Sequence, residues 1–277
     1  MLIARVLAFV SVFGFNAVLA RCLVPADFGL FALLFSLATL TSLLASCGMN
    51  RALVKVLASE SSHDAATLNR VVKLGVYTSI IAGLIVGAIA LTVCANFLPS
   101  SGETSWLIAC MFGGIVLVRN VHFVLAETTR GFHETRWSNL FGGPAGGPIP
   151  HLIFLCALIG FWQTTSIMSL AFVLCIYLVC LLVSLPPLVW KLYSLRNQTV
   201  RSAFVRTTGS TTDLRESTAP PKQSAFTAKS IWVLAIPLML TQTFGLTLSQ
   251  ADIWMAGVLV LPAVSYTHLT LPTICSV

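Results

Sequence analysis

Long runs of apolar residues follow one another along almost the whole chain, with short polar segments between most of them. A helix needs about 20 mostly apolar residues to cross the hydrocarbon core of a bilayer. The sequence predicts an all-α, polytopic transmembrane helical bundle on this criterion. Six spans are expected in the first part of the chain and two in the last, at 2–24, 28–47, 74–98, 107–125, 148–162, 167–193, 231–248 and 253–264.

The composition leaves little material for a surface that faces water. Only 9% of the residues are charged and 57% are hydrophobic, whereas a soluble domain carries about 25% charged residues. The eight cysteines form no Cys-x-x-Cys pair and no Cys/His group with metal spacing, so neither a disulfide framework nor a metal site is indicated. Neither a nucleophile elbow nor a phosphate-binding loop occurs, so the sequence predicts neither an enzyme nor a bound cofactor.

The net charge of +7 is explained by topology better than by nucleic-acid binding, for which no basic surface is apparent. Lys and Arg residues favour cytoplasmic loops. With the amino terminus in the cytoplasm, Arg21 is the single basic residue of the 16 in an outer turn, and Arg5 and Arg119 lie within spans. All the others lie on the inner side. We therefore expect a multi-pass protein with a cytoplasmic amino terminus.

The polar gap after the sixth span divides the chain. Residues 1–196 are predicted to form a first lobe of six helices, 197–229 a cytoplasmic linker rich in Ser, Thr and Pro, and 230–264 the start of a second lobe. Residues 265–277 lose the helical apolar pattern and are treated as a non-native tail. The first residues also resemble a secretory signal peptide, but a second span follows almost at once, which favours a retained helix.

The turn between the first two spans carries a family resemblance. Residues 21–31 read Arg-Cys-Leu-Val-Pro-Ala-Asp-Phe-Gly-Leu-Phe. This string resembles a turn typical of the polysaccharide-export branch of the multidrug/oligosaccharidyl-lipid/polysaccharide flippase superfamily. Gly48 and Arg51-Ala52 after the second span, and Arg130-Gly131 after the fourth, fit the same pattern.

The resemblance implies two six-helix lobes that alternate in access around a central lumen. It also implies a bacterial inner-membrane location and a lipid-linked oligosaccharide, an undecaprenyl-pyrophosphate glycan, as the substrate, with proton or sodium coupling. A drug exporter of the same superfamily and an O-antigen polymerase or ligase are the alternatives. The first should favour acids over arginines in its lumen, and the second large outer loops that this chain does not show. A gene fragment without activity is the third alternative.

Elementary physics also explains the turn itself. Pro25 is expected to end the first helix, Asp27 to cap the second, and Gly29 to permit close backbone approach. The sequence therefore predicts a helical hairpin with a tight outer turn.

Ionisable and amide side chains at membrane depth are the candidate substrate contacts, because each charge there costs at least about 2.5–3.5 kcal/mol and usually faces a cavity or a partner. Snorkelling and bonding between helices are the competing interpretations. Three roles are possible for Asp252: an acid in the lumen, a partner for an arginine, or a helix cap. The predicted substrate-binding residues are Arg5, Asn16, Arg119, Asn120, His122, Gln242 and Asp252.

The fourth span is the densest of these regions. At 100° per residue, five side chains fall within an arc of roughly 160°, which suggests one cationic stripe: Arg119, Asn120, His122, Glu127 and Arg130. Glu127 and Arg130 are expected nearer the membrane interface, and His151 as a hydrogen-bonded packing residue.

Overall fold

The computed structural model describes residues 2–60, 65–97, 103–143, 146–163, 168–209 and 228–259. All regular structure within these ranges is helical, which confirms the all-α polytopic bundle. Five of the helices are long and apolar enough to cross a membrane. The helices are α1 Leu2–Cys22, α2 Pro25–Ala45, α3 Met49–Glu60, α4 Ala65–Phe97, α5 Glu103–Gly131, α6 Thr135–Phe141, α7 Pro148–Trp162, α8 Leu170–Gly209 and α9 Ala228–Leu259.

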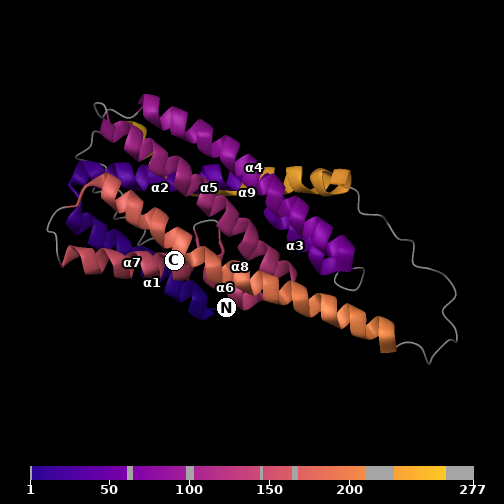
Figure 1. Cartoon of the computed structure of the whole chain (residues 1–277). Helices are drawn as coiled ribbons and strands as arrows, with labels where there is room; N and C mark the ends of the chain where they lie inside the picture. The colour runs from indigo at the N-terminus through magenta and orange to yellow at the C-terminus, as the bar shows by residue number, and fades with distance from the viewer. Residues whose placement is uncertain are drawn as a thin grey trace.

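Helix α5 lies at the centre of the bundle (Figure 1), in contact with α2, α3, α4, α6 and α8. Two thirds of its membrane-spanning window is buried, whereas that of α4 is mostly exposed. The exposed side of α4 is an apolar stripe with the three- to four-residue spacing of one helix face, at Tyr77, Ile81, Leu84, Ile85, Ile89 and Val93. Such an apolar face is stable in contact with lipid tails, whereas its exposure to water would be unfavourable.

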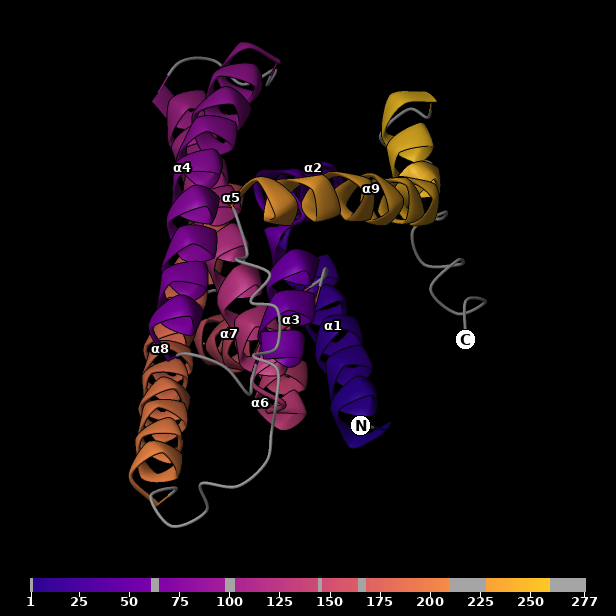
Figure 2. The same ribbon diagram turned by 90° about the vertical axis from the view of Figure 1, so that its right-hand side faces the viewer.

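A pair of glycines brings α4 and α5 together. A Cβ atom on Gly113 would lie 2.9 Å from the carbonyl oxygen of Gly87, and a Cβ atom on Gly87 would lie 3.1 Å from that of Gly113. The two backbones therefore touch, as small residues permit in membrane helices. Figure 2 shows the two helices side by side along most of their length.

The first turn differs from the prediction in its details. Helix α1 ends at Cys22, and Pro25 is the first residue of α2, where its missing N–H costs nothing. The N-cap is Val24, so the prediction that Asp27 caps α2 is wrong; its charge lies in the first turn, which favours the helix dipole. Nothing lies within 4 Å of a Cβ built on Gly29, so the predicted close approach there is wrong as well.

Helix α3 was not predicted, because residues 48–73 were treated as a loop. It buries Met49, Ala52, Leu53, Val56 and Leu57. This is the i, i+3, i+4, i+7, i+8 pattern of an amphipathic helix, and it was visible in the sequence. Helix α3 has 12 residues and one apolar face, so it does not meet the criterion of a long apolar run that identifies a membrane-spanning helix.

The polar linker and the last two spans also need correction. Helix α8 continues to Gly209, so the first part of the predicted linker is helical. Its 40 residues extend about 60 Å, about twice the hydrocarbon thickness. The sequence predicts a break between two spans at 248–253, but the single helix α9 runs through these residues. Asp252 therefore lies inside a helix, and the prediction that it caps one is wrong. Figure 2 shows α9 bent near its carboxyl end. Residues 210–227 and the predicted tail lie outside the described residues.

Candidate substrate pocket

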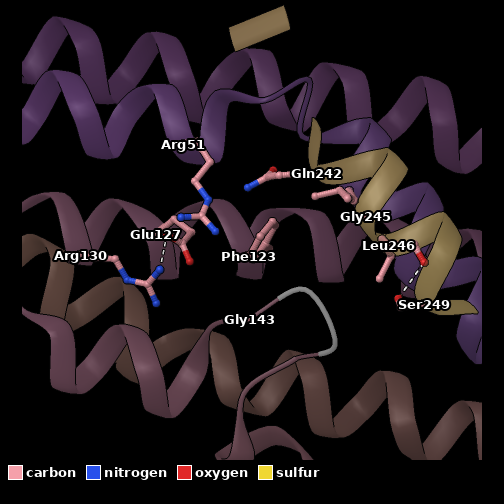
Figure 3. A pocket seen from close by; sticks show the side chains of 10 residues that line it. Arg51, Phe123, Glu127, Arg130, Gly143, Gln242, Gly245, Leu246 and Ser249 are labelled. Atoms are coloured by element: carbon pink, nitrogen blue, oxygen red, sulfur yellow. Dashed lines mark hydrogen bonds and ion pairs between the residues drawn. The ribbon is translucent and has the colours of Figure 1, made fainter. Parts of the chain in front are cut away.

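A pocket of about 310 Å³ opens between α2, α3, α5 and α9 (Figure 3). One wall is charged and comes from α3 and α5, and the opposite wall is uncharged and comes from α9. Gly143, between α6 and α7, completes it. The lining residues are Leu43, Arg51, Phe123, Glu127, Arg130, Gly143, Gln242, Gly245, Leu246 and Ser249.

The charged wall is organised around a buried carboxylate. Glu127 is 2% exposed, and Arg130 Nη1 donates to its Oε2 at 3.0 Å. Arg130 Nη2 donates to Asn139 Oδ1 at 3.1 Å, so the guanidinium is fixed from both sides. Arg51, whose side chain is exposed, points toward Glu127 from α3 in Figure 3. The wall thus carries two positive charges and one negative charge.

Two side-chain hydrogen bonds hold α9 across the pocket. Asn50 Nδ2 donates to Gln242 Oε1 at 3.0 Å, and Ser36 Oγ donates to Gln250 Oε1 at 2.8 Å. Because polar side chains within a membrane bundle find few other partners, these bonds fix the register of α9 against α2 and α3. Gln242 therefore lines the pocket, as predicted for a substrate contact, with its amide oxygen already in use.

A second, smaller cavity lies behind the first and shares Phe123 and Gly143 with it. Its volume of about 10 Å³ is close to the minimum for one water molecule. Arg119 and His122 both line this cavity. Two of the predicted substrate contacts of the fourth span therefore line the same small cavity.

Arg119 is 5% exposed, and its guanidinium lies over an aromatic ring. Its guanidinium carbon lies 4.8 Å from the centroid of the Phe35 ring on α2. Tyr177 and His151 pack against the same ring at 5.7 and 6.1 Å between centroids. The side chain thus points into the lobe and away from lipid, and cation–π attraction contributes to its stability.

The other predicted residues of the fourth span turn to different neighbours, so the single cationic stripe is not what the structure shows. Asn120 faces α4, where its Nδ2 donates to the carbonyl of Ser79 at 2.6 Å and its Oδ1 accepts from Ser79 Oγ at 3.1 Å. His122 Nε2 lies 3.1 Å from Ser184 Oγ on α8. Helix packing on three sides of α5 separates side chains that a wheel diagram groups together.

The remaining candidates divide into those that bond locally and those outside the described side chains. Asn16 Nδ2 donates to the carbonyl of Val12 one turn earlier, at 2.9 Å. The side chains of Arg5 and Asp252 are not described. His151 is buried, and neither ring nitrogen has a hydrogen-bond partner among the described residues, so the expected hydrogen bond is not found.

The three charged residues of the pocket are not among the predicted substrate contacts. Arg51 enters the predictions through topology and the family pattern, and Glu127 and Arg130 as residues of the membrane interface. The i, i+3 spacing of Glu127 and Arg130 predicts their ion pair. No sequence signal brings Arg51 to the same place, because that depends on how α3 packs on α5.

Replacing Asn120 should weaken the bundle more than replacing Asn16 does. Asn120→Ala removes two hydrogen bonds between α4 and α5 and leaves the buried Ser79 carbonyl without this donor, so we expect a loss of about 1–3 kcal/mol in the free energy of unfolding. Asn16→Ala is the matched control, since it loses one bond within its own helix. Equal thermal unfolding of the two variants in detergent would contradict this assignment.

Comparison with known proteins gives one match. Residues 1–135 match the profile of a family described as polysaccharide biosynthesis protein. Arg51, Arg119, Glu127 and Arg130 lie within the match, and the α9 wall lies beyond it. Searches of curated proteins and of solved structures found no match. The family resemblance of the first hairpin is confirmed over the matched residues.

Proposed function

We propose, from the match of residues 1–135 to the profile of polysaccharide biosynthesis proteins, that this chain is a flippase for a lipid-linked oligosaccharide. The substrate is an undecaprenyl-pyrophosphate glycan of cell-surface polysaccharide synthesis. The protein moves it across the bacterial inner membrane, with its own amino terminus in the cytoplasm. Two lobes alternate in access, driven by protons or sodium, and the protein is not an enzyme.

The observation that carries the proposal is the pocket with Arg51 and Arg130 on its wall and Arg119 behind it. An arginine within an apolar bundle is costly unless it meets a partner or a ligand. Guanidinium groups are suited to phosphate oxygens, because their planar donors bind two oxygens at once. The glycan would occupy the hydrated lumen, and the polyprenyl tail would remain in lipid.

The alternatives predict different lining chemistry. A drug exporter for cations should present carboxylates and aromatic rings in excess of arginines, whereas the pocket wall has a surplus of positive charge. A polymerase or ligase would need reactive side chains near a sugar acceptor. The described pocket residues include no cysteine, histidine or lysine, and its one carboxylate is engaged by Arg130.

Complementation tests the function directly. Expression of this protein should restore surface polysaccharide in a bacterial strain that lacks its own flippase, and lipid-linked oligosaccharide should stop accumulating on the cytoplasmic leaflet. The measurement is the fraction of lipid-linked glycan accessible to a membrane-impermeant lectin in spheroplasts. Resistance to cationic dyes without restored polysaccharide would favour the drug exporter. Longer glycan chains at unchanged leaflet distribution would favour the enzyme.

A further inference from the structure

The ion-pair cluster on the pocket wall has one more positive than negative charge. Glu127 is almost fully buried, yet its closest partner, Arg130 at 3.0 Å, is a wall residue of the open pocket. Arg51 faces the same carboxylate from another helix (Figure 3). A carboxylate beside two arginines at a pocket wall occupies the position that an incoming anion would take.

Asn139 gives Arg130 a second, neutral anchor. The bond from Nη2 to Asn139 Oδ1 does not involve Glu127 and joins α5 to α6. If the contact with Glu127 breaks, the guanidinium therefore stays in place and its Nη1 donor becomes available. Arg51 has an exposed side chain and can reorient at little cost.

We propose that Glu127 acts, in the empty protein, as an internal substitute for the diphosphate that the proposed function brings to Arg51 and Arg130. This inference rests on the proposed function and specifies its substrate contact. Phosphate oxygens compete with the Glu127 carboxylate for Arg130 and engage Arg51 at the same time. In the empty pocket Glu127 offsets one of the two positive charges until a suitable anion enters.

The charges set the specificity. A monoanion that displaces Glu127 from Arg130 forms one ion pair and breaks another, so its binding gains little free energy. A diphosphate carries negative charge on two adjacent phosphorus centres, so it can pair with both arginines. The site should therefore prefer a diphosphate to chloride, and also to the single phosphate of an ordinary phospholipid headgroup, which offers the same oxygen chemistry.

Binding of inorganic pyrophosphate to the purified chain tests the proposal. We would use isothermal titration calorimetry with the protein in phosphatidylcholine nanodiscs. Glu127→Gln keeps the shape of the side chain and removes the competing charge, so pyrophosphate should bind about tenfold more tightly. Arg51→Gln should weaken binding about tenfold or more. Because Arg51 is exposed, this second variant should fold even if the first does not.

Glu134 and Lys191 supply the matched controls. They form the other described ion pair, at 3.4 Å, and neither lines the pocket. Glu134→Gln and Lys191→Gln remove the same kinds of charge away from the pocket, and should leave pyrophosphate affinity unchanged. Tighter binding in both Glu→Gln variants, with equally weakened binding in Arg51→Gln and Lys191→Gln, would mean a non-specific charge effect and would overturn the proposal.

Two further outcomes would overturn it. If Glu127 only positions Arg130, Glu127→Gln will weaken pyrophosphate binding. If phospholipid headgroups are the true ligand, nanodiscs that contain phosphatidylglycerol will abolish pyrophosphate binding, whereas the proposal expects it to persist. The assay needs no transport, so failed complementation with intact pyrophosphate binding would reject the flippase and leave the anion site standing.

Discussion

Replacing Arg119 with alanine is expected to abolish complementation of a flippase-deficient strain. Arg119 lines the small cavity that shares Phe123 and Gly143 with the pocket. Loss of a buried charge-assisted contact with phosphate costs about 3 kcal/mol, or about a hundredfold in affinity. The measurement is surface polysaccharide at matched membrane levels of the two proteins.

Arg119 also packs on Phe35, so its variants must separate charge from folding. Arg119→Met keeps most of the volume and removes the charge, and should lose transport as fully as alanine. Arg119→Lys keeps a charge for the phosphate and for the Phe35 ring but loses the planar fork, and should retain part of the activity. Full transport by Arg119→Met at normal membrane level would show that Arg119 is structural and remove its role in the lumen.

Replacing Gly48 with alanine is expected to detach α9 from the pocket. Gly48 has a φ of +71°, and a Cβ atom there would lie 2.1 Å from the carbonyl oxygen of Ala235 on α9. The left-handed conformation costs about 1–2 kcal/mol for other residues, and overpacking costs about 1–3 kcal/mol more. The carbonyl belongs to a helix backbone, so the whole of α9 must move.

The loss in unfolding free energy should therefore be about 2–5 kcal/mol, read as a lower thermal unfolding midpoint of the purified chain. Gly29→Ala is the matched control, because that glycine has open space around it inside α2, and it should raise stability by up to about 1 kcal/mol. Both variants add one methyl group in or beside α2. Similar midpoints for the two would contradict the packing of α9 on the α2–α3 turn.

The membrane helices were predictable because their signal is thermodynamic and local. In hydrocarbon each backbone polar group must be satisfied within its own segment, so an apolar run of sufficient length can only be a helix. Helix α7 has the predicted bounds, and α1, α2 and α5 differ by a few residues, with the larger differences at their polar ends. Amphipathic α3 and the polar extension of α8 were missed because neither is an apolar run.

The pocket could not be predicted in the same way, since it depends on which helix each face packs against. The sequence alone determined that Arg119 lies at membrane depth and that Glu127 and Arg130 are one turn apart. Tertiary packing decided that Asn120 bonds across to α4, and that Arg51 reaches Glu127 from α3. A helix's period sets the direction of each side chain around its own axis, but the neighbour in that direction is fixed by long-range contacts such as Gly87 on Gly113 and α9 on Gly48.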